Sequence, residues 1–138
     1  MSTHLKDKAE QILQVLERLA EENRNGKPIL VEGRKDAEAL KTLGINGQII
    51  FAKTGGKTLL DVISEVEAAN PSEIILLPDF DRRGRELTAN LKRYMEKAGI
   101  KANLHFWLRL SSLVGREVKD VEGLAAYMET LKSKIGDS

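Results

Sequence analysis

The alternation of short apolar runs with longer amphipathic stretches constrains the fold of this chain more than any other feature of its sequence. A short apolar run rich in β-branched residues is typical of a buried strand, and apolar residues three and four positions apart are typical of a helix. Strands are expected over residues 28–31, 48–52, 74–77 and 100–107, and helices over 5–22, 37–43, 57–69, 83–98 and 121–134. Because parallel strands need crossover connections, this order predicts an α/β fold with a four-stranded, mainly parallel sheet and helices on both faces.

The length of 138 residues suits one domain with a hydrophobic core and is short for two. We expect the core of the domain at residues 28–110. An amphipathic helix is expected in residues 1–27, and a C-terminal helical extension packed on the core is expected in residues 111–138. We therefore expect extra N-terminal and C-terminal helices in addition to those of the core.

Composition narrows the classes of protein to which the chain can belong. It has no cysteine, which excludes disulfides and thiolate-bound zinc. No run approaches the roughly 20 apolar residues that span a bilayer, and no leader peptide is visible, so we expect a cytoplasmic protein without a membrane partner. The net charge is only +1, but seven basic and two acidic residues fall between Arg82 and Lys101. Affinity for nucleic acid would have to come from such local clustering.

Three acidic residues follow two of the expected strands. Glu32 comes directly after residues 28–31, and Asp79 and Asp81 come shortly after residues 74–77. The carboxyl ends of parallel strands meet at one edge, where open α/β sheets bind ligands. In extended backbone, Asp79 and Asp81 point to the same side and repel each other unless a cation lies between them. Mg²⁺ prefers such oxygen ligands, and Mn²⁺ also accepts them.

Glycines and basic residues adjoin these acids. Gly33 and Gly84 are expected to let the backbone turn sharply into helices whose N-terminal amides favour phosphate. The side chains expected to contact phosphate are Arg34, Lys53, Lys57, Arg82, Arg83 and Arg85. A P-loop is excluded, because Phe51 stands where its first glycine is required. Structural alternatives stay open: an Asp before a helix can simply be its N-cap, and exposed charges can simply be solvated.

Residues 31–36 (VEGRKD) and 76–84 (LLPDFDRRG) resemble the two signatures of the Toprim domain. These are a Glu-Gly pair after the first strand and an Asp-x-Asp with a nearby Gly after the third. The chain is similar to small stand-alone Toprim proteins and to the Toprim domains of bacterial-type and archaeal primases, topoisomerases and the maturase of the smallest ribosomal RNA. The resemblance implies a Rossmann-like Toprim fold over about residues 28–110. It also implies that Glu32 is an acid-base residue or metal ligand, that Asp79 and Asp81 hold Mg²⁺, and that RNA or DNA is the partner.

Two functions follow from these expectations. The first is a Mg²⁺-dependent protein that acts on nucleic-acid phosphodiesters, as a nuclease or an RNA- or DNA-processing factor. The second is a non-catalytic, metal-dependent nucleic-acid-binding module of a ribonucleoprotein or processing complex. A phosphatase of the haloacid-dehalogenase type is disfavoured, because its Asp-x-Asp belongs on the first strand. Such a phosphatase also needs a later acidic pair, and the C-terminal part offers only the scattered Glu117, Asp120 and Glu122.

Overall fold

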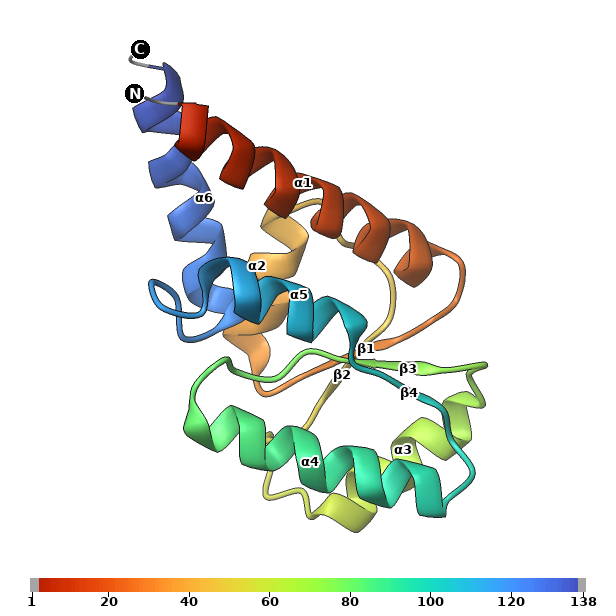
Figure 1. Cartoon of the computed structure of the whole chain (residues 1–138). Coiled ribbons are helices and arrows are strands. Elements are labelled where there is room, and N and C mark those ends of the chain that lie inside the picture. The colour runs from red at the N-terminus through yellow and green to blue at the C-terminus, as the bar shows by residue number, and fades with distance from the viewer. Residues whose placement is uncertain (1–2, 137–138) are drawn as a thin grey trace.

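Four short parallel strands lie at the centre of the computed structural model, which describes residues 3–136 (Figure 1). The strands are β1 (Ile29–Val31), β2 (Ile49–Phe51), β3 (Ile74–Leu76) and β4 (Ala102–Asn103). Their order across the sheet is β2-β1-β3-β4, and each neighbouring pair is parallel. The predicted α/β fold with a four-stranded parallel sheet is therefore confirmed.

Six helices within residues 3–136 cover the two faces of this sheet. They are α1 (Thr3–Arg24), α2 (Arg34–Thr42), α3 (Leu59–Ala69), α4 (Arg82–Lys97), α5 (His105–Val114) and α6 (Val121–Gly136). Helices α3 and α4 lie on one face, whereas α1, α2, α5 and α6 lie on the other (Figure 1). None of the helices in this part of the chain is both long and apolar enough to cross a lipid bilayer.

Successive residues of β1 and β3 are buried on opposite faces, and Ile50 of β2 is buried as well. Leu30, Ile50 and Leu76 pack against α3 and α4, while Ile29 and Ile75 pack on the other side. Each of these side chains is at most 1% exposed. A parallel sheet covered on both faces buries such continuous apolar runs, which is why the strands could be recognised in the sequence.

The expected strand at residues 100–107 is wrong over most of its length. Only Ala102–Asn103 pair with β3, and α5 begins two residues later. The Asn103 side chain accepts a hydrogen bond from the backbone N of His105 at 2.8 Å. Such local side-chain bonds compete with strand pairing and favour a turn into a helix. Trp107 is therefore a buried residue of α5 rather than of a strand, and the expected domain boundary at residue 110 falls inside that helix.

The chain leaves two neighbouring strands toward opposite faces of the sheet. Helix α2 follows β1 on one face, and α4 follows β3 on the other (Figure 1). Such a divergence is the topological switch point at which open α/β sheets leave a crevice beyond the strand ends. Glu32 and Asp79 lie on the two sides of this point.

Candidate functional site

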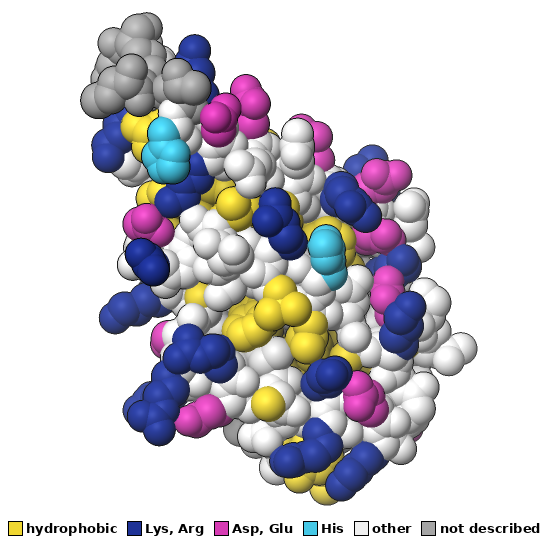
Figure 2. All heavy atoms as spheres, viewed as in Figure 1, with side chains coloured by type: hydrophobic (Ala, Val, Ile, Leu, Met, Phe, Trp, Pro, Cys, Tyr) yellow, Lys and Arg dark blue, Asp and Glu magenta, His cyan; other side chains and the backbone are white. Residues whose placement is uncertain are grey.

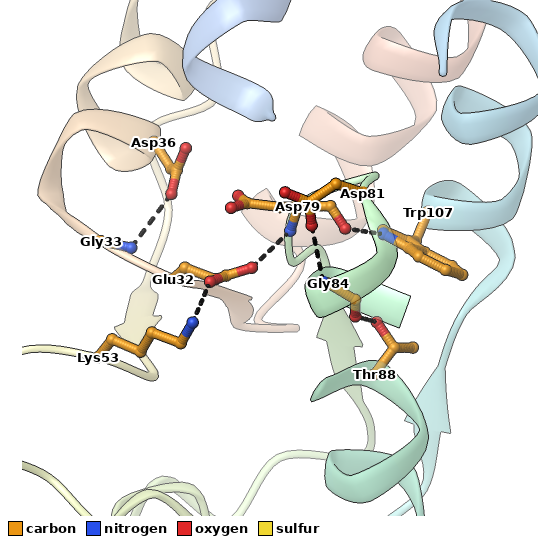
Figure 3. Close-up of polar contacts among 9 residues, drawn as sticks. All are labelled: Glu32, Gly33, Asp36, Lys53, Asp79, Asp81, Gly84, Thr88 and Trp107. Carbon is orange, nitrogen blue, oxygen red and sulfur yellow. Dashed lines mark hydrogen bonds and ion pairs between the residues drawn. The ribbon is translucent and has the colours of Figure 1, made fainter. Parts of the chain in front are cut away.

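Glu32 connects the ends of β1 and β3. It is only 8% exposed, and its Oε2 accepts a hydrogen bond from the backbone N of Asp79 at 2.8 Å (Figure 3). One step earlier in the same ladder, the carbonyl of Leu30 accepts from the backbone N of Leu77. The Glu32 carboxylate therefore takes the place of the next backbone acceptor between these strands.

The backbone of Asp79 is held from its other side as well. Its carbonyl oxygen accepts a hydrogen bond from Nε1 of Trp107 at 3.1 Å. A Cβ atom at Gly84 would overlap that same carbonyl oxygen. The first turn of α4 can therefore approach Asp79 only because residue 84 is glycine.

The carboxylate of Asp79 has no hydrogen bond or ion pair with any residue between 3 and 136. Figure 3 shows its side chain directed away from Trp107, toward the side on which Glu32 and Asp36 lie. Burial raises the pKa of Asp79 to about 7, and negative charges nearby add to the shift. The contributing neighbours, in decreasing order, are Glu32, Asp36, Asp120 and Asp81. An unpaired carboxylate among other acids is a position that a cation would stabilise.

Asp81 begins α4 as its N-cap. Its Oδ1 accepts a hydrogen bond from the backbone N of Gly84 at 2.8 Å, and Phe80 between the two aspartates is buried. The structural role of an N-cap is thus filled by Asp81 and not by Asp79. The second carboxylate oxygen of Asp81 has no hydrogen bond within the described residues.

The two glycines expected at sharp turns differ from each other. Gly33 has extended backbone (φ −148°, ψ −179°), which any residue adopts, and there is open space where a Cβ would stand. Its conformation therefore does not require glycine. Position 84 does require glycine, because it lies against the backbone of Asp79 and not because the chain turns there.

Three further acids lie at the site, and sequence reasoning did not assign them to it. Asp36 is 8% exposed and accepts hydrogen bonds from the backbone N of Gly33 at 3.1 Å and of Glu122 at 3.2 Å. Burial raises the pKa of Asp36, although both hydrogen bonds oppose the shift. Asp120 comes from the turn before α6 and Glu122 from the first helical turn of α6, and both line one cavity with Glu32 and Asp79. No local pattern in the sequence could reveal this, because the turn reaches the site only when α6 packs on α2.

Among the expected phosphate contacts, Lys53 lies closest to the acids. Its Nζ forms an ion pair with Oε1 of Glu32 at 2.8 Å. The hydrogen bond with Glu32 raises the pKa of Lys53, which stays positively charged. Arg34 and Lys35 line the same cavity, and Arg83 lies close enough to Lys53 for the two charges to repel.

The other expected basic contacts lie farther out. Lys57 is held away from the cavity, because its Nζ contacts Oε1 of Glu65 at 2.6 Å. The exposed Arg82 pairs with Glu86 at 3.3 Å, and Nη1 of Arg85 lies 3.5 Å from the carbonyl oxygen of Phe80. Figure 2 shows Lys and Arg side chains gathered at the left, where α4 begins, and again at the lower right, where it ends.

The cavity at this edge has a volume of about 320 Å³. Within residues 3–136, no three His, Cys, Asp or Glu side chains are arranged, as they stand, to hold a metal ion. Mg²⁺ does not need three, because it is usually held by one or two carboxylates together with water and substrate phosphate. The free carboxylate of Asp79 and the free oxygen of Asp81 suit that mode of binding. Both oxygens of Glu32 are already engaged, by Lys53 and by the Asp79 backbone.

Comparison with known proteins adds a family context. The Toprim domain matches residues 27–107. A UPF0292 protein of Methanosarcina acetivorans is 38% identical over 129 residues, which cover 94% of this chain and 88% of that protein. A UPF0292 protein of Methanocaldococcus jannaschii is 38% identical over 120 residues, covering 86% and 91%. A solved structure of a protein from Aquifex aeolicus has a TM-score of 0.65 and 25% identity, and the match covers 80% of this chain and 94% of that one.

Proposed function

This chain belongs to the Toprim domain family and to the UPF0292 proteins, and we propose that it is a Mg²⁺-dependent nuclease or RNA- or DNA-processing factor. Membership of the Toprim family indicates a metal-dependent function related to nucleic acid. The observation that carries the finer proposal is the carboxylate of Asp79. It is unpaired within the described residues, lies among other acids, and is fixed through its backbone by Glu32 and Trp107.

The acids have separate roles in this proposal. Asp79 and Asp81 hold Mg²⁺, or Mn²⁺ in its place, together with a phosphate of the substrate. Mg²⁺ held there would supply charge neutralisation at the reacting phosphate and a lower pKa for a water molecule. Glu32 keeps Asp79 in position through Oε2, and once Lys53 has moved to the phosphate, its Oε1 takes up the proton of the water that attacks phosphorus. The bond from phosphorus to the leaving oxygen breaks as the new bond to the water oxygen forms, and the leaving oxygen takes a proton from solvent.

The basic residues then bind the nucleic-acid backbone around this centre. Arg34, Lys53 and Arg83 lie next to the acidic cavity and contact the phosphates nearest the metal. Arg82 and Arg85, both exposed in the first turn of α4, contact phosphates farther from the metal. Lys57 is not among the residues proposed to bind phosphate, because it already pairs with Glu65.

A second candidate function is a non-catalytic, metal-dependent module that binds RNA or DNA in a processing complex. The observation that favours it is the double engagement of Glu32, which leaves no free oxygen to act as a base. The basic surface and the metal ligands would then serve binding alone. We place either activity in the cytoplasm.

One experiment separates the two candidates. The purified chain is incubated with labelled single-stranded and structured RNA and DNA in Mg²⁺, Mn²⁺ or EDTA. Metal-dependent cleavage that is lost in Glu32→Gln and Asp79→Asn supports the enzyme. Glu38→Gln is the matched control, since Glu38 is exposed on α2 and should leave cleavage intact. Metal-dependent binding with intact nucleic acid would instead support the binding module. If the chain neither binds nor cleaves nucleic acid, both candidates are contradicted.

A further inference from the structure

The turn Lys119–Glu122, by which we mean the bend before α6 and the first two residues of that helix, lies outside the segment matched by the Toprim family and is hydrogen-bonded to the segments that follow β1 and β3. The carbonyl of Lys119 accepts a hydrogen bond from the backbone N of Phe80 at 2.6 Å, between the two aspartates. The backbone N of Glu122 donates to Oδ1 of Asp36 at 3.2 Å. Movement of this turn would therefore require breaking contacts to the start of α2 and to the loop after β3.

Packing makes the turn rigid as well. Val118, Val121 and Leu124 are each at most 4% exposed. Asp120 caps α6 by accepting a hydrogen bond from the backbone N of Gly123 at 2.6 Å. Asp36 completes the arrangement, because its second oxygen accepts from the backbone N of Gly33 and so ties the turn to the end of β1.

The turn also changes the charge of the cavity. The core contributes three acids and three bases to the lining, whereas the turn contributes two acids and no base. The core members are Glu32, Asp36, Asp79, Arg34, Lys35 and Lys53. The carboxylate of Glu122 is exposed and has no hydrogen bond or ion pair with residues 3–136. Among the residues that line the cavity, the excess of negative charge therefore comes from the turn.

We propose that Glu122 accepts hydrogen bonds from the water shell of the bound metal ion, and that Asp36 is a positioning residue that acts through Glu122. Mg²⁺ keeps several of its waters in protein sites, and a carboxylate beyond direct contact can bind those waters. Asp36 fixes the backbone from which the Glu122 side chain reaches the cavity. The inference rests on the proposed metal-dependent function and extends its site beyond the Toprim core.

Titration of the full chain with Mg²⁺ and Mn²⁺ by isothermal calorimetry tests the role of Glu122. Glu122→Gln should weaken binding of both metals roughly tenfold, the usual effect of losing a partner in the outer shell of a metal site. Glu129→Gln is the matched control, because Glu129 is an exposed residue of the same helix and does not line the cavity. Equal affinity of Glu122→Gln and wild type would overturn the inference.

A double-mutant cycle tests whether Asp36 acts through Glu122. Asp36→Asn keeps one acceptor oxygen, loses the other, and should weaken metal binding to about the same extent as Glu122→Gln. The double variant should bind no more weakly than either single variant. Additive losses, or a lower melting temperature with unchanged metal affinity, would contradict the positioning role. If Asp79→Asn loses metal binding while Glu122→Gln does not, only this inference fails; if wild type binds no metal, the proposed function fails with it.

Discussion

The carboxylate of Glu32 replaces a backbone carbonyl as the acceptor for the backbone N of Asp79, at a distance of 2.8 Å. One side chain thereby continues the ladder between β1 and β3 at the point where the chain leaves these strands toward opposite faces. The same carboxylate pairs with Lys53 on the loop after β2. A residue expected to do chemistry therefore also determines the geometry of the loop that carries Asp79.

Removing Glu32 should separate its structural role from its charge. Glu32→Ala leaves the backbone N of Asp79 without its acceptor in a mostly buried position, which should lower the free energy of unfolding by about 1–3 kcal/mol. Glu32→Gln keeps an acceptor for that N–H and loses only the ion pair with Lys53. Its free energy of unfolding should therefore fall by about 1 kcal/mol or less. Urea denaturation in EDTA measures both. Equal losses in the two variants would contradict the hydrogen bond as the important contact.

The two glycines beside the acids should respond differently to alanine. Gly84→Ala places a Cβ against the carbonyl oxygen of Asp79, so the start of α4 has to shift, and we expect a loss of about 3 kcal/mol or more. Gly33→Ala meets open space in extended backbone and changes only an N-cap, so the loss should stay below about 1 kcal/mol. Thermal denaturation compares the two. A larger loss for Gly33→Ala would contradict this description of both loops.

Most of this fold follows from patterns that are local in the sequence. The apolar runs that contain Leu30, Ile50 and Leu76 are buried on both faces, and each is followed by a helix with its own apolar spacing. The parallel order then brings the residues after β1 and β3 to one edge. For this reason the neighbourhood of Glu32 and Asp79 could be predicted without coordinates.

Two features could not be predicted in the same way. Residues 100–107 alternate apolar and polar side chains through Phe106, which imitates a strand, but the side-chain bond from Asn103 to the backbone of His105 begins a helix. Asn103, whose side chain can accept a hydrogen bond from the backbone two residues on and so favour a turn, was the signal that could have corrected this. The arrival of Asp120 and Glu122 at the site depends on the packing of α6 against α2, a contact between distant parts of the chain.

The stability of the metal-free protein should fall with rising pH because of Asp79. Its folded-state pKa of about 7 lies above the ordinary value of 3.8. Between these values the folded state binds a proton that the unfolded state has released, so this contribution is complete below about pH 4 and lost as pH rises through about 7. Asp79→Asn removes the titrating charge and, since the carboxylate has no hydrogen bond among residues 3–136, should lose no contact.

We therefore expect Asp79→Asn to be more stable than wild type at pH 8 in EDTA, by about 1–2 kcal/mol after allowance for solvent screening. At pH 4 the two proteins should be nearly equal. Asp7→Asn, on the exposed side of α1, controls for the loss of one negative charge at a distance from the site. A constant difference between Asp79→Asn and wild type from pH 4 to pH 8 would contradict the raised pKa.

Lys53 should compete with the metal and cooperate with the nucleic acid. Its ammonium group lies 2.8 Å from Oε1 of Glu32 and is also attracted by Asp79, so it places a positive charge directly beside the acids in the metal-free protein. Lys53→Met should therefore bind Mg²⁺ more tightly, by roughly fivefold if the competing ion pair contributes about 1 kcal/mol. The same variant should bind RNA or DNA more weakly, and the slope of log Kd against log salt should fall by about one. Lys57→Met is the matched control, because Lys57 lies on the same loop but pairs with Glu65. It should leave the Mg²⁺ affinity unchanged. Weaker Mg²⁺ binding in Lys53→Met would show that Lys53 supports the metal site instead of competing with it.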